Sequence, residues 1–189
     1  MAKKNQDSEP LRTQEQIALV RMLLKETRES LRNRIIFDIG INNGLRTGDI
    51  LKMKVKDVYD TDQLQIREGK TGKSRTIRFH PDLQKEITDY LEGRKQRSKW
   101  LFPNPNNPDE HITTQAVYRL FKRLAAGHKD LKGLTAHSMR RTFGYWYYRR
   151  YHDIATLMVI LNHSSQSITL RYIGITDDTV NHALKNFKL

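Results

Sequence analysis

The sequence predicts an α+β fold that is mostly helical, with a small three-stranded antiparallel sheet inserted early in the chain. Apolar residues recur at helical spacing through most of the sequence, a central stretch alternates as strands do, and turn residues separate the segments. A length of 189 residues suits one compact domain. We expect residues 1–10 to be a disordered leader and residues 11–189 to form the domain.

The first elements are expected to be helices. Thr13 can cap the first one, because a glutamine stands three residues later and an apolar run follows. The second helix should begin near Ser30, and Gly40 and Gly44 should interrupt it. Residues 46–53 then predict a short helix that opens at this turn.

The middle of the chain has strand character in three segments, at residues 55–58, 63–68 and 75–79. The sequence Gly-Lys-Thr-Gly-Lys at residues 69–73 separates the last two and is expected to form a hairpin loop. Pro81 then leads into another helix. Residues 102–109 hold three prolines and three asparagines, so we expect a loop there.

The remainder of the chain is predicted to be helical. Thr113 or Thr114 should cap the next helix, and a break follows at residues 127–133. Four further helices are expected at about 136–150, 153–161, 165–173 and 176–186.

The composition favours a polyanionic partner. Lys and Arg number 34 against 21 Asp and Glu, a formal net charge of +13, and nucleic acid is the commonest reason for such a surplus. An anionic membrane surface is the competing interpretation, but the basic residues form no single amphipathic face. The chain has no cysteine, which excludes disulfides, thiolate–zinc sites and cysteine nucleophiles. No apolar run approaches the roughly 20 residues that span a bilayer, and we expect a cytoplasmic protein.

Six residues are the candidates for chemistry: Arg46, Lys70, His137, Arg140, His163 and Tyr172. Taken singly, each has an ordinary explanation as a surface, turn or core residue. The glycines and lysines around Lys70 do not have the spacing of a Walker phosphate loop. His137 and Arg140 lie one helical turn apart, on one face. The order and spacing of the whole set are more specific than any member.

Three motifs contain most of these residues. They read Gly-Leu-Arg-Thr-Gly-Asp-Ile at 44–50, Ala-His-Ser-Met-Arg-Arg-Thr-Phe at 136–143 and Leu-Asn-His-Ser-Ser-Gln-Ser-Ile-Thr-Leu-Arg-Tyr at 161–172. With Lys70 in its hairpin, they resemble the catalytic domain of the tyrosine recombinases, the phage-integrase family, over roughly residues 11–187. Asn162 stands where members commonly have glycine, and asparagine is the next-best residue for a left-handed backbone. Asp49 stands where many have glutamate, and its carboxylate can still support Arg46.

The resemblance implies the tyrosine recombinase catalytic fold and a DNA transesterification. Arg46 and Arg140 would clamp the phosphate oxygens, since guanidinium groups stay charged and bind bidentately, and His163 would donate a further hydrogen bond. Tyr172 would be the nucleophile and form a 3′-phosphotyrosine. Its hydroxyl has an ordinary pKa of about 10, so His137 would accept its proton. Lys70 would protonate the leaving 5′ oxygen.

The implied reaction requires no metal ion, ATP or other cofactor, because the phosphotyrosine conserves the energy of the broken bond. The partner would be double-stranded DNA, bound mainly through phosphates, and strand exchange implies a homo-tetramer on DNA. The apolar face of residues 177–186 either packs on its own domain or, as the family implies, docks on a neighbouring protomer, which we favour. The chain has no room for the usual DNA-clamping domain, so we expect a single-domain member or a fragment.

Three alternatives remain open at the level of sequence. A type IB topoisomerase would use the same chemistry to relax supercoils. A non-catalytic DNA-binding protein would explain the charge but not six reactive groups in this order. A ribonuclease that used the two histidines would leave Tyr172 and the arginines without a role.

Overall fold

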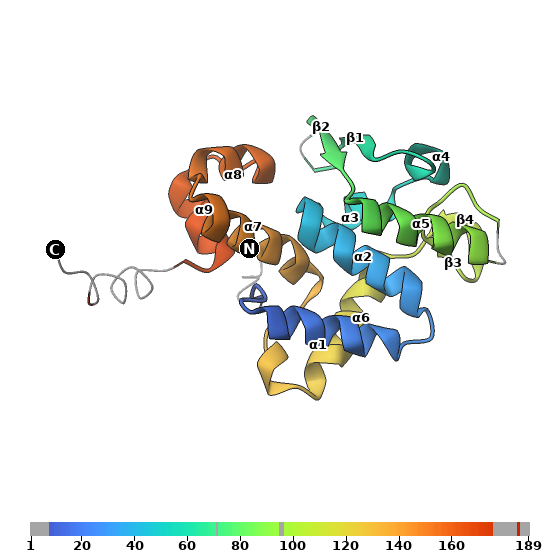
Figure 1. The fold of residues 1–189 in the computed structure, drawn as a ribbon, viewed down its shortest axis with the longest axis horizontal. Coiled ribbons are helices and arrows are strands. Elements are labelled where there is room, and N and C mark those ends of the chain that lie inside the picture. The colour runs from blue at the N-terminus through green and yellow to red at the C-terminus, as the bar shows by residue number, and fades with distance from the viewer. Residues whose placement is uncertain (1–7, 71, 95–96, 176–184, 186–189) are drawn as a thin grey trace, which may run out of the picture.

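The computed structural model of the protein describes residues 8–70, 72–94, 97–175 and 185. Its elements in chain order, drawn in Figure 1, are α1 (Gln14–Lys25), α2 (Ser30–Asn43), α3 (Thr47–Leu51), α4 (Val55–Val58), β1 (Gln63–Arg67), β2 (Ser74–Arg78), α5 (Pro81–Gly93), β3 (Pro103–Asn104), β4 (Asn107–His111), α6 (Thr114–Ala126), the 3₁₀ turn η1 (Lys129–Leu131), α7 (Ala136–Tyr151), α8 (Ile154–Leu161) and α9 (Gln166–Ile173). The predicted class, a mostly helical α+β fold with a small antiparallel component, is confirmed.

Side-chain caps explain where most helices begin. Thr13 and Gln16 form the expected capping box at α1, in which each side chain bonds the backbone N–H of the other. Thr113, and not Thr114, caps α6. The helices that carry the later motifs have side-chain caps of the same kind, contributed by Thr135, Asp153 and Ser165.

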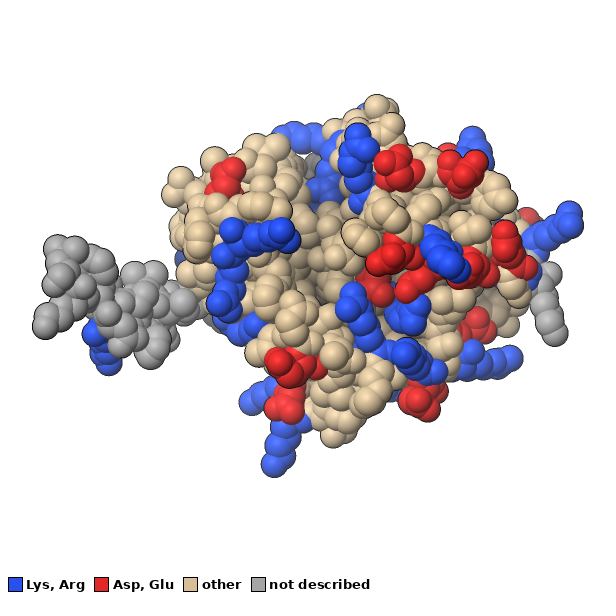
Figure 2. All heavy atoms as spheres, in the orientation of Figure 1, with Lys and Arg blue, Asp and Glu red and all other residues tan. Residues whose placement is uncertain are grey.

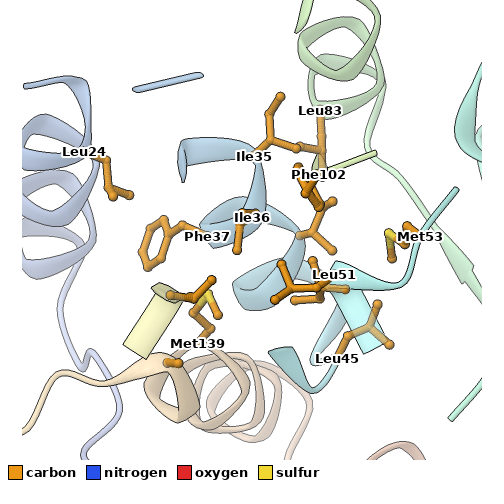
Figure 3. Packing of buried hydrophobic residues seen from close by; sticks show 14 of the residues in the cluster. Leu24, Ile35, Ile36, Phe37, Leu45, Leu51, Met53, Leu83, Phe102 and Met139 are labelled. Atoms are coloured by element: carbon orange, nitrogen blue, oxygen red, sulfur yellow. The ribbon is translucent and has the colours of Figure 1, made fainter. Parts of the chain in front are cut away.

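Helix α2 is the centre of the main core. It packs against α1, α5 and α7, and Figure 1 shows it between these helices. Ile35, Ile36, Phe37 and Ile39 are almost completely buried, and Figure 3 shows side chains from several other elements around them. Because the helix is enclosed on nearly all sides, its apolar residues show no single amphipathic stripe.

The end of α2 lies slightly beyond the predicted interruption. The helix continues through Gly40 to Asn43, and Gly44 then adopts a left-handed conformation with φ +61°. A side chain at Gly44 would meet the ring of Phe143 from α7. Glycine is therefore required here both for the backbone and for space, and the chain turns directly toward Arg46.

The sheet differs from the expected three strands. Residues 55–58 form the short helix α4, and β1 pairs antiparallel with β2 alone, with Ile66 opposite Arg75. Val55 and Val58 are separated by two polar residues, a spacing that suits one helical turn, and four residues are too few to identify a strand. The predicted hairpin between the strands is present, with Gly72 at φ +67° in its loop.

The segment 102–109 was predicted wrongly as an irregular loop. Most of it belongs to a small hairpin of β3 and β4, whose prolines occupy positions that a sheet edge tolerates. The two strands are short and their register is irregular. Prolines and asparagines are typical of loops, but a tight hairpin also requires turn residues. Their presence therefore did not indicate that the flanking residues pair as strands.

The last residues of the predicted leader pack against the domain. Ser8 and Pro10 are buried. The amide of Glu9 donates to Gly133, and the amide of Leu11 donates to Thr142 Oγ1 at 2.9 Å. Residues 8–12 therefore pack along α7. Residues 1–7 lie outside the described part of the chain.

Helices α7, α8 and α9 form a smaller second core around Leu157, Leu161 and Ile173. Gly144 of α7 allows α9 to approach closely, since a Cβ there would lie 2.7 Å from Ile173. The helix predicted at 176–186 falls almost entirely outside the described residues. Within the described residues, no helix has the length and apolarity needed to cross a bilayer.

Candidate active site

A buried carboxylate joins the two predicted clamp arginines. Glu68, at the end of β1, is only 3% exposed, and one of its oxygens accepts a hydrogen bond from Arg46. Its other oxygen lies 3.6 Å from Nη1 of Arg140. A buried charge is tolerated when it is paired in this way. Glu68 thus holds the two guanidinium groups side by side.

Arg140 also connects the loops that carry two other candidates. Its Nη1 donates to the carbonyl of Gly44 at 2.6 Å, and its Nη2 donates to the carbonyl of Leu161 at 2.8 Å. These carbonyls lie two residues before Arg46 and two residues before His163. A guanidinium has five N–H groups, so these two bonds leave donors for a ligand.

Arg75 of β2 forms a parallel connection that sequence reasoning missed. Its guanidinium donates to the carbonyl of Ile160 at 2.9 Å and to that of Asn43. Burial, followed by the charge of Arg140, lowers the pKa of Arg75. Arg75 and Arg140 therefore bridge the same two helix ends, those of α2 and α8, where carbonyl groups lack intrahelical partners.

His163 and Tyr172 lie together. Their rings meet edge to face with centroids 5.0 Å apart. Asn162, just before His163, has the predicted left-handed conformation with φ 49° and ψ 54°. Burial, followed by the charges of Arg140 and Arg46, lowers the pKa of His163 to about 4, so its imidazole is neutral at neutral pH.

Tyr172 is held near the arginines as an un-ionised phenol. Burial raises the pKa of Tyr172, while the charge of Arg140 is the largest of the effects that oppose it. The guanidinium of Arg141 lies over the Tyr172 ring, 5.0 Å from its centroid, a cation–π contact that sequence reasoning also missed. The hydroxyl therefore requires a base when it attacks.

His137 is at the first turn of α7, where its side chain is exposed. Although His137 is exposed as a whole, the neighbouring protein removes part of the hydration of its ring, which lowers the pKa of His137, so the ring is neutral and can accept a proton at neutral pH. The positive charges that lower this pKa further belong, in decreasing order, to Arg141, Arg140, Lys70 and Arg46. His137 therefore lies within electrostatic range of Lys70, which is exposed on the hairpin loop.

The hairpin that carries Lys70 is attached to the rest of the site at several points. Asp49 Oδ1 accepts from the amide of Gly69 at 2.9 Å, so Asp49 supports the hairpin, and the carboxylate paired with Arg46 is Glu68 instead. Lys73 Nζ donates to the side chain of Asn162 at 2.7 Å. A cavity of about 490 Å³ lies between the hairpin and α8. Within the described residues, no group of His, Asp and Glu side chains could hold a metal ion.

The structure thus brings all six candidates to one region, between the hairpin and the ends of α2, α7, α8 and α9. In Figure 2, lysine and arginine side chains line the hollow between the α8–α9 part and the hairpin. The sequence offered weak signals for the additional residues. Glu68 is an acidic residue in a basic hairpin, and Arg75 stands in an alternating strand. Neither pattern indicates which distant groups the side chain contacts.

This fold is that of tyrosine recombinase catalytic domains. The profile of the Phage integrase family matches residues 11–178, and the chain belongs to that family. It is 41% identical over 179 residues to the probable integrase/recombinase YoeC of Bacillus subtilis (strain 168), covering 95% of this chain and 96% of YoeC.

Other relatives are longer. Tyrosine recombinase XerA of Pyrococcus horikoshii is 30% identical over 163 residues, which cover 85% of this chain and 56% of XerA. The crystal structure of the XerH site-specific recombinase in a post-cleavage complex with palindromic difH matches with a TM-score of 0.71 and 20% identity, over 98% of this chain and 55% of XerH. The chain therefore spans little more than half of these two proteins.

Proposed function

We propose that the protein is a site-specific DNA recombinase, with residues 11–189 as its catalytic domain. The observation that carries the proposal is the position of Tyr172 beside Arg140 and His163, with Arg46 held next to Arg140 by Glu68. The relatives are named as integrases and recombinases, so relaxation of supercoils is not the favoured outcome. We propose a cytoplasmic location for the protein.

In the proposed reaction, Arg46, Arg140 and His163 hold the non-bridging oxygens of a DNA phosphodiester. These donors stabilise the charge that develops on the phosphorus oxygens in the transition state. The hydroxyl oxygen of Tyr172 attacks phosphorus, and His137 accepts the phenolic proton. The bond to the 5′ oxygen breaks, and Lys70 supplies the proton for that oxygen.

The products of this step are a 3′-phosphotyrosine and a free 5′-hydroxyl. The 5′-hydroxyl of another strand then attacks the phosphotyrosine, which restores the tyrosine and forms the recombinant phosphodiester. One phosphoester bond is exchanged for another in each step, so the proposed cycle needs neither ATP nor an added cofactor.

The test is covalent capture on DNA with Tyr172→Phe as the matched variant. Nicked duplexes with randomised sequence around the nick are incubated with protein, adducts that survive boiling in detergent are isolated, and their DNA is sequenced. We expect adducts with the wild type and none with the phenylalanine variant, at similar DNA affinity, because the ring keeps its packing. Adducts in the variant would contradict the assignment of Tyr172. The tyrosines of α7, namely Tyr145, Tyr147, Tyr148 and Tyr151, would then be the candidates.

We also propose that the protein acts as a homo-tetramer on DNA, with its C-terminal segment docked on a neighbour. Two observations support this: XerH and lambda integrase were solved in complex with DNA, the latter as a dimer, and apolar residues recur at helical spacing in the sequence of residues 177–186. Deleting the residues after Thr176 should leave binding of a single protomer intact but weaken assembly on paired sites and change cleavage. Gel shifts beside the capture assay measure both, and unchanged cooperativity with unchanged cleavage would contradict docking in trans.

A further inference from the structure

A threonine that the mechanism does not use contacts the candidate phosphate-binding histidine. Thr169 of α9 is completely buried, and its hydroxyl oxygen lies 3.1 Å from Nδ1 of His163. The same hydroxyl lies 3.0 Å from the carbonyl oxygen of Ser165, one turn earlier in the helix. Both distances are those of hydrogen bonds.

The hydroxyl has two possible acceptors but only one hydrogen. If Thr169 donates to Ser165, its oxygen can only accept from His163, so the ring hydrogen must be on Nδ1. If Thr169 donates to Nδ1, the ring hydrogen must be on Nε2. A neutral imidazole carries one ring hydrogen, and the lowered pKa of His163, about 4, keeps it neutral at neutral pH. The direction of the Thr169 hydroxyl therefore decides the tautomer of His163.

Rotation of the hydroxyl leaves no buried polar group without a partner. When Thr169 turns to His163, the carbonyl of Ser165 still accepts from the backbone amide of Thr169 at 3.2 Å. No heavy atom has to move between the two arrangements. The two states are therefore close in free energy, because an unmade buried hydrogen bond is the main cost that could have separated them.

We propose that Thr169 is a positioning residue that switches the tautomer of His163 when DNA is bound. Without DNA, Thr169 donates to Ser165 and His163 carries its hydrogen on Nδ1. With a phosphodiester in the site, Thr169 donates to Nδ1, and the Nε2–H of His163 is free to donate to a phosphate oxygen. This inference rests on the proposed function, since it assigns His163 to the scissile phosphate.

The switch is built into the helix that carries the nucleophile. Thr169 precedes Tyr172 by three residues on α9, so both side chains lie on one face of it, and His163 contacts both of them. A displacement of α9 would therefore remove the nucleophile and the correct tautomer together. That coupling prevents a half-assembled site from activating a phosphate.

The experiment reads the tautomer directly by ¹⁵N NMR of histidine-labelled protein at pH 7.5. The chain has seven histidines, and comparison with His163→Gln assigns the relevant signals. Thr169→Val removes the hydroxyl at nearly constant volume, and Thr169→Ser keeps it. The DNA-bound samples carry Tyr172→Phe and a duplex of the sequence recovered by covalent capture, so that no cleavage intervenes.

We expect the hydrogen to move from Nδ1 to Nε2 on DNA binding in the wild type and in Thr169→Ser, and the Nδ1–H form to be lost in Thr169→Val. With Tyr172 present, Thr169→Val keeps the Nε2–H that the phosphate requires but loses the hydrogen bond that fixes the orientation of the ring. It should therefore cleave about 10-fold more slowly, the lower end of what loss of a group that orients a histidine costs in metal sites, and Thr169→Ser should restore most of the rate. An unchanged tautomer on binding, a doubly protonated ring or a wild-type cleavage rate in Thr169→Val would each overturn the proposal. Absence of any adduct in the wild type would instead refute the proposed function, and the DNA-free spectra would still test the hydrogen on Nδ1.

Discussion

The charged residues of the site are structural as well as chemical. Arg140 is 3% exposed and donates to two backbone carbonyls, while Glu68 contacts both Arg140 and Arg46. Positive charges of Arg140, Arg141 and Arg46 act on Tyr172, and one buried carboxylate, Glu68, pairs with two of these arginines. A phosphodiester would enter a region whose cations are already oriented, which reduces the reorganisation needed in the transition state.

Lys70 is the residue whose role can be isolated most sharply. Lys70→Ala should slow cleavage of an ordinary phosphodiester by about 10²- to 10⁴-fold, the usual contribution of a general acid. The variant should be largely rescued when the leaving 5′ oxygen is replaced by sulfur, because a thiolate leaves without a proton. Lys73→Ala is the matched control from the same hairpin, and Lys73 already bonds Asn162. Sulfur rescue of the Lys73 or Lys54 variant but not of the Lys70 variant would show that the wrong lysine was chosen.

His163 should make the fold sensitive to acid. In the unfolded chain its pKa has the ordinary value near 6.5, whereas the pKa in the folded protein is about 4. As pH falls from 6.5 to 4, the unfolded state gains a proton that the folded state does not, so the free energy of unfolding decreases. This contribution is fully present above pH 6.5.

The corresponding test is urea denaturation of His163→Gln between pH 7.5 and 4. Because His163 is only partly buried, solvent screening reduces the expected effect to about 1 kcal/mol. Between pH 7.5 and 4 the free energy of unfolding of both proteins should decrease. The decrease should be about 1 kcal/mol smaller for His163→Gln than for the wild type. His128→Gln, outside the site, is the control and should follow the wild type. A parallel decrease in wild type and His163→Gln would contradict the assigned pKa.

At the scale of elements, the site is a junction of two helix ends. The last carbonyls of α2 and α8 face the guanidinium groups of Arg75 and Arg140. Helix C-termini carry partial negative charge, so the C-terminal ends of α2 and α8 repel each other. The guanidinium groups of Arg75 and Arg140 lie between these ends and stabilise their close approach. The loops that continue from these ends carry Arg46 and His163, and the junction sets their separation.

Arg75→Lys should weaken this junction. Lysine keeps the charge but cannot donate to two carbonyls from a rigid fork, so we expect a loss of about 2 kcal/mol in the free energy of unfolding. Arg78→Lys on the same strand is the matched control, because its ion pair with Asp62 is exposed and should contribute little. Urea denaturation of both variants measures the difference. Equal stabilities for the two would mean that the contacts of Arg75 are energetically unimportant.

At the scale of the whole molecule, charge should dominate DNA affinity. The net charge is +13, and Figure 2 shows lysines and arginines both in the hollow and elsewhere on that face. Each phosphate contact releases condensed counterions, so affinity should decrease steeply with salt. We expect a decrease of about 10³-fold or more between 50 and 200 mM salt, measured by fluorescence anisotropy with Tyr172→Phe. A nearly flat dependence would argue against binding mainly through phosphates.

The sequence by itself determined most of the helices and the candidate residues for chemistry, because these depend on local patterns. Capping residues marked helix starts at Thr13 and Thr113, the left-handed Asn162 followed from its residue type, and the order of motifs identified the family. Short segments were less certain. Residues 55–58 became a helical turn and residues 103–111 a hairpin, since a few residues satisfy either pattern and tertiary packing selects one.

Only the tertiary structure decided how the site is held together. The partners of Glu68 and Arg75 lie on other elements, and the partner of Thr169 depends on the rotation of a single hydroxyl. Nothing in the local sequence of these residues specifies a distant carbonyl or ring nitrogen. The sequence indicated Asp49 as the support of Arg46, but the fold brings Glu68 to Arg46 and leaves Asp49 on the hairpin amide. Residue types set which interactions are possible, and the packing of α2, α7, α8 and the hairpin decides which of them form.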